Sequence, residues 1–222
     1  MIDSRQPSFP IGRVLGRIKA TTRPWKETAL TQVSQSGQPF RLLIGCLLSL
    51  RTKDETTHPA AERLFALADG PEEMLRLTVP RIERAIYPVG FYRTKAKNIL
   101  GICRRLTREH DGKVPGDLDA LLALPGVGRK TANLVLGLGF NIAAICVDTH
   151  VNRIPNRWGY IKTSNPGETE IALRKKLPKR FWISINELLV LFGQRICRPV
   201  SPHCSRCPVP EFCARVGVGK SR

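Results

Sequence analysis

The chain has 222 residues, 42% of them hydrophobic, so it is long enough to bury a core and too apolar to be disordered. Its 36 lysines and arginines against 18 acidic residues give a net charge of +18, which predicts a polyanionic partner, nucleic acid ahead of a membrane surface. No apolar run reaches about 18 residues and the basic start resembles no secretory signal, so we expect no membrane span and a reducing, cytoplasmic or nucleoid location.

The spacing of apolar residues predicts many short helices and no strands, and therefore an all-α protein. A basic, partly loose segment of about 24 residues comes first, and Asp54 is expected to cap one of the helices that follow. One predicted helix starts at 24–27, and a long one ends at about 110. The others cover 40–50, 54–67, 72–77, 80–86, 168–177 and 183–196.

A glycine-rich turn separates two further predicted helices. Apolar residues at 118–124 are interrupted by Gly126 and Gly128, and helical spacing resumes at Thr131 with a plausible stop at Gly139. We expect a helix–hairpin–helix whose glycines adopt positive φ and let the backbone approach a ligand closely. The N–H groups at the start of the second helix would then suit a phosphate.

A lysine and an aspartate accompany this turn. Lys130 lies in the first turn of the second helix beside Arg129, and Asp148 follows 18 residues later. Helix N-termini and neighbouring cations favour a neutral amine, and an amine with a carboxylate suits Schiff-base chemistry at a sugar carbon. From the residues alone, Lys130 could equally be a phosphate contact or a solvated side chain, and Asp148 could be a helix N-cap.

Four of the seven cysteines are close together near the end of the chain, in the spacing C-x6-C-x2-C-x5-C. Four thiolates can bind a 4Fe–4S cluster or one zinc ion, and the presence of only one short C-x2-C pair favours the cluster. The expected ligands are Cys197, Cys204, Cys207 and Cys213. The other three, Cys46, Cys103 and Cys146, lie among apolar residues and are expected to be buried thiols.

Three features in this order resemble the endonuclease III family of helix–hairpin–helix DNA glycosylases. They are Leu124-Pro-Gly-Val-Gly-Arg-Lys-Thr-Ala132, Val147-Asp-Thr-His150 and the cysteine spacing, and the similarity covers about residues 40–213. The resemblance implies two helical lobes. A six-helix barrel lobe with the hairpin would span 32–142, and a second lobe of 1–31 plus 143–222 would carry the 4Fe–4S cluster.

The resemblance also implies a bifunctional DNA glycosylase/AP lyase of base excision repair. Lys130 matches the lysine that displaces an oxidised or damaged pyrimidine and forms a Schiff base, and Asp148 matches the aspartate that assists base loss. β-Elimination would then cleave the strand 3′ to the abasic site. The partner would be double-stranded DNA with a damaged base or an abasic site, bound by a monomer. The residues expected at the DNA are Arg51, Phe91, Leu124, Gly126, Val127, Gly128, Arg129, His150, Arg198 and Arg206.

Three positions depart from the family pattern. Arg51 stands where the family commonly has a glutamine that fills the gap left by the extruded nucleotide, and Phe91 stands where an aliphatic wedge is usual. Both could alter substrate choice, or both could be surface variation on loops. Pro155 falls inside the helix after Asp148 and is expected to kink or end it.

The same residues leave other functions open. A related adenine glycosylase usually lacks this lysine and has a glutamate where Cys46 stands here. A thymine or uracil mismatch glycosylase and a pyrimidine-dimer glycosylase share the fold. A lesion-binding module without catalysis is a fourth possibility, and the presence of both Lys130 and Asp148 argues against it.

Overall fold

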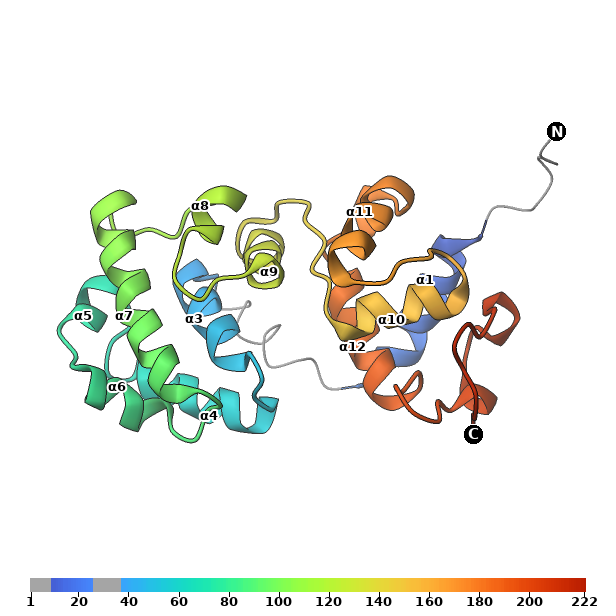
Figure 1. Ribbon diagram of the computed structural model, residues 1–222, viewed down its shortest axis with the longest axis horizontal. Coiled ribbons are helices and arrows are strands. Elements are labelled where there is room, and N and C mark those ends of the chain that lie inside the picture. The colour runs from blue at the N-terminus through green and yellow to red at the C-terminus, as the bar shows by residue number, and fades with distance from the viewer. Residues whose placement is uncertain (1–8, 26–36) are drawn as a thin grey trace. The chain divides into compact units, whose positions relative to one another are not determined.

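The computed structural model describes residues 9–25 and 37–222 of the chain. These residues form helices joined by short loops, and no strand occurs within the two ranges, so the predicted all-α class is confirmed. The chain divides into two compact units, residues 27–146 and residues 1–26 with 147–222, which we call the hairpin unit and the cysteine unit (Figure 1). The helix start predicted at 24–27 and the boundary predicted at 31–32 extend into residues 26–36, outside the described part.

The hairpin unit contains seven described helices. They are α3 (Pro39–Ser49), α4 (Asp54–Phe65), α5 (Pro71–Leu75), α6 (Val79–Ile86), α7 (Tyr92–Glu109), α8 (Leu118–Leu122) and α9 (Arg129–Phe140). Their bounds follow the apolar spacing of the sequence within a few residues. Asp54 is the first residue of α4, and Lys53 holds the capping position, so the prediction that Asp54 caps this helix is wrong by one position.

Helix α3 is the centre of the hairpin unit. Its residues 42–48 are all buried, and it contacts α4, α7 and α9. A helix that is apolar on every side is stable only when other elements surround it. Gly139 of α9 allows close packing, because a Cβ at this position would lie 3.3 Å from Leu42 Cδ2. The stop predicted at Gly139 is therefore wrong, and α9 ends one residue later, before the left-handed Asn141 with a φ of +53°.

The cysteine unit combines the first described helix with the last ones. Its elements are α1 (Ile11–Thr22), α10 (Thr149–Trp158), α11 (Pro166–Lys176), α12 (Ile185–Arg195) and the short 3-10 turns η1 (Lys179–Phe181), η2 (Cys204–Arg206) and η3 (Pro210–Phe212). Helix α12 contacts both α1 and α10 and is the middle of this unit. Phe192 of α12 is fully buried.

Helix α1 lies in the segment of about 24 residues for which the sequence predicts a partly loose chain, and for residues 11–22 this prediction is wrong. Val14, Leu15 and Ile18 recur at helical spacing and are buried, while basic residues occupy the exposed side of the helix. The charged residues dominate the average hydropathy of this segment, so its amphipathic helix is easily missed in the sequence.

Helix α10 passes through Pro155 and ends only at Trp158, before the left-handed Gly159 with a φ of +74°. The expectation that Pro155 would end the helix is therefore wrong. Proline removes one backbone N–H, which would have bonded to the carbonyl of Val151, and the rest of the helical bonding continues. Among the described residues of both units, no helix is long and apolar enough to cross a membrane.

Candidate functional site

The hairpin between α8 and α9 is held tightly against the core. Leu124 and Val127 are buried, and the Val127 N–H donates to the Leu124 carbonyl at 3.1 Å. Gly126 has a φ of +78°, and a Cβ at this position would lie 2.4 Å from Asn98 Nδ2. Glycine is therefore favoured at position 126 by its left-handed backbone, and a Cβ there would also displace the Asn98 amide. Because the side chains of Leu124 and Val127 anchor the turn, only their backbone is left to face a ligand.

The start of α9 has a glycine at its N-cap. Gly128 takes this position with extended backbone, φ −96°, so only Gly126 of the two hairpin glycines has the positive φ expected for both. Gly128 offers no side chain to cap the helix, and no acidic residue lies in its first turn. The first N–H groups of the helix therefore have no intrahelical partner, beside the positive end of the helix dipole. Gly128 and Arg129 are exposed at this end.

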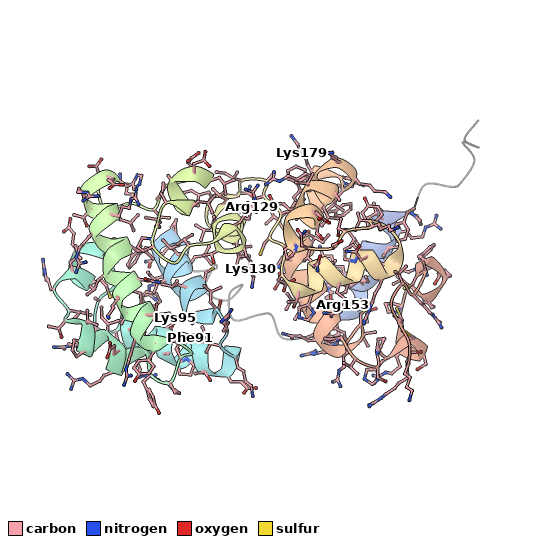
Figure 2. The ribbon with its side chains drawn as sticks, viewed as in Figure 1. Phe91, Lys95, Arg129, Lys130, Arg153 and Lys179 are labelled. Atoms are coloured by element: carbon pink, nitrogen blue, oxygen red, sulfur yellow. The ribbon has the colours of Figure 1, made fainter. Side chains whose placement is uncertain are left out.

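Lys130 is exposed in the first turn of α9, directly after the hairpin (Figure 2). The Cys46 thiol of α3 is close enough to feel its charge. Burial raises the pKa of the Cys46 thiol to about 12, and the positive charge of Lys130 opposes this rise. Cys46 is therefore a neutral, buried thiol at neutral pH, and it supplies neither a base nor a nucleophile beside the lysine.

Asp148 belongs to the cysteine unit, where it is the N-cap of α10. One carboxylate oxygen, Oδ1, accepts hydrogen bonds from the backbone N–H of His150 at 2.9 Å and of Val151 at 2.8 Å. The structure therefore shows the helix N-cap that the sequence allows as another role for Asp148. Both of these hydrogen bonds go to Oδ1 of the carboxylate. Lys130 and Asp148 lie in different units, and the structure gives the surroundings of each within its own unit.

His150 is half-buried between α10 and α12. Its Nδ1 lies 3.0 Å from Arg153 Nη2, and a Cβ on Gly193 of α12 would lie 2.2 Å from the same nitrogen. Gly193 thus leaves the space that the imidazole occupies. Arg153 also donates to the Cys197 carbonyl at 2.8 Å. His150 is consequently packed into the unit by its ring.

The four predicted ligand cysteines come together around one place. All four are half-buried, and burial together with the negative charges of the other three thiolates raises the pKa of Cys207 to about 11. Burial also raises the pKa of Cys213, and Cys197 and Cys204 add to that rise. Mutual repulsion of this kind is relieved when a cation or a cationic cluster binds between the thiolates.

Arginine 157, a buried residue of α10, supports the cysteine loop. Arg157 donates to the carbonyls of Arg198 and Pro199 at 2.6 Å each, and its Nη1 lies 3.6 Å from Cys197 Sγ. The Cys213 Sγ in turn lies 3.5 Å from the Arg157 carbonyl. Arg198 and Arg206 are exposed on this loop. The guanidinium of Arg157 thus binds the Cys197 end of the four-cysteine segment, and its backbone carbonyl binds the Cys213 end.

Within residues 9–25 and 37–222, no group of three or more His, Cys, Asp or Glu side chains is close enough to hold one metal ion. The four C-terminal cysteines are consistent with the predicted 4Fe–4S cluster, because each corner iron of a cubane takes one thiolate.

Arg51 and Phe91 lie on two neighbouring loops of the hairpin unit. Both side chains are exposed, and the Arg51 guanidinium carbon lies 5.5 Å from the centroid of the Phe91 ring. The loops come so close that a Cβ on Gly90 would lie 2.8 Å from the Arg51 carbonyl oxygen. The structure thus brings together two of the three positions that depart from the family pattern.

Comparison with known proteins settles the family. The HhH-GPD superfamily of base excision DNA repair proteins matches residues 44–179. Endonuclease III of Thermotoga maritima is 47% identical over 187 residues, which are 83% of this chain and 88% of that protein. The chain belongs to the endonuclease III family. Endonuclease III of Escherichia coli K12 is 40% identical over 175 residues, 79% of this chain and 83% of that protein.

Solved structures agree with this assignment. An endonuclease III trapped as a covalent intermediate with DNA superposes with a TM-score of 0.84 at 34% identity, covering 95% of this chain and 97% of that chain. A thermostable thymine-DNA glycosylase, at 23% identity and a TM-score of 0.80, shares the fold. The endonuclease III family comprises DNA glycosylases with AP lyase activity, so the predicted enzyme class is confirmed.

From the sequence, no role is predicted for two buried cations of this chain, Lys95 and Arg157. Arg157 holds the cysteine loop, and Lys95 of α7 binds the loop that carries Arg51. The sequence nevertheless contains a sign that both side chains are buried. Lys95 stands four residues before Ile99, on the apolar face of its helix, and Arg157 stands three residues after Ile154, also on an apolar face. A cation at a core-facing position needs a buried partner.

Proposed function

We propose that this member of the endonuclease III family removes oxidised or damaged pyrimidines from duplex DNA through a Schiff base on Lys130. The observation that carries the proposal is the exposed Lys130 in the first turn of α9, directly after a hairpin in which Gly126 has a φ of +78°. The N–H groups at this helix start would bind a DNA phosphate and so place the neighbouring sugar beside the amine.

The chemistry starts once the damaged nucleotide has left the base stack. The neutral Lys130 amine attacks C1′, the bond between C1′ and the base breaks, and the base leaves with the electron pair and takes up a proton. Ring opening gives an iminium between Nζ and C1′, which acidifies the C2′ proton. Loss of that proton expels the 3′ phosphate by β-elimination, and water then releases Lys130.

Asp148 is the proposed carboxylate of this reaction. While Oδ1 accepts two backbone hydrogen bonds, Oδ2 would stabilise the positive charge that develops on the sugar and then move protons. Because the two oxygens of the carboxylate take different roles, Asp148 can cap α10 and act in catalysis at the same time.

The four cysteines are the proposed ligands of a 4Fe–4S cluster, Cys197, Cys204, Cys207 and Cys213. A bound cluster would supply shape to the η2 and η3 loops, on which Arg198 and Arg206 are exposed, and we assign it no step in bond cleavage. These thiolates require a reducing compartment. Iron and sulfide analysis of the purified protein should give four of each per chain, whereas stoichiometric zinc without iron would refute the assignment.

A nicking screen tests the proposed substrate class. Duplexes with one thymine glycol, one T·G mismatch, one A·G mismatch, one cyclobutane dimer or one abasic site are incubated with the enzyme. We expect strand cleavage at thymine glycol and at the abasic site. Base removal confined to the mismatches or the dimer would instead support another glycosylase of the same fold, and binding without cleavage would support a lesion-binding module.

A further inference from the structure

The loops that carry Arg51 and Phe91 adopt backbone conformations that residues other than glycine usually avoid. Arg51 has a φ of +53° and Phe91 a φ of +57°, both in the left-handed region that favours glycine. Such conformations persist only where the surroundings determine them, and they are frequent at functional positions. Phe91 is 63% exposed, so burial of its own ring does not hold it in place.

Lys95 is the group that determines this arrangement. Its Nζ donates hydrogen bonds to the Leu48 carbonyl at 2.8 Å, to the Leu50 carbonyl at 2.6 Å and to Thr52 Oγ1 at 3.3 Å. All three acceptors belong to the end of α3 and the loop after it, which carries Arg51. Helix α3 has no basic residue in its last turn, so Lys95 is the cation that faces its negative dipole end.

Lys95 itself lies on α7, the helix whose N-cap is Phe91. Phe91 holds the N-cap position of α7, and the Lys95 N–H donates to the Phe91 carbonyl at 3.0 Å. The Gly90 N–H, one residue before Phe91, donates to Thr52 Oγ1 at 3.1 Å. Lys95 and Thr52 thus connect both loops, and the Arg51 guanidinium lies over the Phe91 ring.

Lys95 itself does not reach solvent. Only 5% of its surface is exposed, so it is no phosphate contact, in contrast to the exposed Lys97 on the same helix. A buried ammonium with three oxygen acceptors is a fixed structural joint. Every acceptor of this joint lies within two residues of Thr52 or on α3 just before it.

We propose that Lys95 is a positioning residue that presents Arg51 and Phe91 as one preassembled wedge for the gap left by an extruded nucleotide. This inference rests on the proposed function, because a gap exists only if a nucleotide leaves the stack. The stacked guanidinium and ring enter the duplex together, and neither side chain has to be ordered at the moment of binding.

Replacement of the buried amine tests the proposal. Lys95→Met keeps most of the aliphatic stem and removes the three donors, and Lys97→Met is the matched control on the exposed side of α7. We measure KM and kcat on a thymine glycol duplex, and borohydride trapping on a single-stranded abasic oligonucleotide, which has no gap to fill. We also measure the fluorescence of 2-aminopurine placed opposite the lesion.

The expected result for Lys95→Met is a rise in KM on the lesion duplex of about 10- to 100-fold, because a misplacement of about 1 Å has effects of this size. Trapping on the single strand should change less than twofold, and the 2-aminopurine signal at saturating protein should fall. Combined with Arg51→Ala, the substitution should add little to the effect of Arg51→Ala alone.

Equal loss on both substrates, an unchanged KM, or additive effects with Arg51→Ala would overturn the inference. Thr52→Val repeats the test with a smaller change if Lys95→Met does not fold, because it removes the oxygen that Lys95 and Gly90 share. A wild-type enzyme that neither nicks the lesion duplex nor traps an abasic site would instead refute the proposed function.

Discussion

Substitution of Asp148 separates its role as a helix cap from its proposed role in catalysis. Asparagine has an oxygen in the same place and ranks with aspartate as an N-cap, so Asp148→Asn should keep both bonds from the His150 and Val151 N–H groups. It loses only the attraction between the carboxylate and the helix dipole, about 0.5 kcal/mol. Asp148→Ala loses the cap as well, and the total cost is about 2 kcal/mol.

These free energies correspond to measurable changes in melting temperature. For a chain of this size, 1 kcal/mol shifts the melting temperature by about 2–4 °C, so Asp148→Ala should melt about 4–8 °C lower and Asp148→Asn about 1–2 °C lower. Loss of the ionised group should nevertheless slow base removal by Asp148→Asn about 100-fold or more. Melting is followed by circular dichroism, and single-turnover nicking of a thymine glycol duplex gives the rate.

Asp117 provides a matched control. It is the N-cap of α8, with Oδ1 accepting from the Ala120 N–H at 2.9 Å, and no catalytic role is assigned to it. Asp117→Asn should leave both the melting temperature and the nicking rate nearly unchanged. If Asp148→Asn melts as low as Asp148→Ala, or if it binds DNA poorly but cleaves what it binds at the normal rate, then Asp148 is a structural cap and the catalytic assignment is wrong.

Two further predictions concern the hairpin unit. Gly126→Ala should destabilise the protein by about 2 kcal/mol and weaken binding of an abasic duplex in fluorescence polarisation, because it combines a φ of +78° with a Cβ 2.4 Å from Asn98 Nδ2; wild-type melting and binding would refute the role of this turn. Burial lowers the pKa of Lys95 from 10.5 to about 8, so between these values the unfolded chain binds more protons and stability rises with pH. The unfolding free energy of the wild type relative to Lys95→Met should therefore increase by about 2.5 kcal/mol between pH 7 and pH 10 in urea titrations, and a flat difference would show that the ammonium is not desolvated.

The sequence predicts most of the helices because their apolar residues recur at helical spacing. It also predicts the hairpin, the lysine and the four cysteines, because chemistry requires particular residue types at particular spacings. Helix α1 is not predicted because its charged residues outweigh its apolar residues in the average hydropathy of the segment. Pro155 is misjudged because a proline costs one hydrogen bond, which a buried helix in a packed unit can lose without ending.

The joint at Lys95 could not be derived from spacing. Its acceptors, the Leu48 and Leu50 carbonyls, are backbone groups 45 or more residues away along the chain, and backbone groups leave no mark in a sequence. What the sequence does contain is a lysine on the apolar face of a helix, which predicts a buried partner without naming it. The close contact of Gly90 with the Arg51 carbonyl is likewise visible only in the folded unit.

Covalent trapping tests the central claim most directly. The wild type and Lys130→Ala are incubated with an abasic duplex and sodium borohydride, which reduces a Schiff base to a stable amine, and the products are separated on a denaturing gel. The wild type should form a protein–DNA adduct, peptide mapping should place it on Lys130, and Lys130→Ala should form none while it still binds the duplex. An adduct of undiminished yield in Lys130→Ala would contradict the account, because another amine would then be the nucleophile.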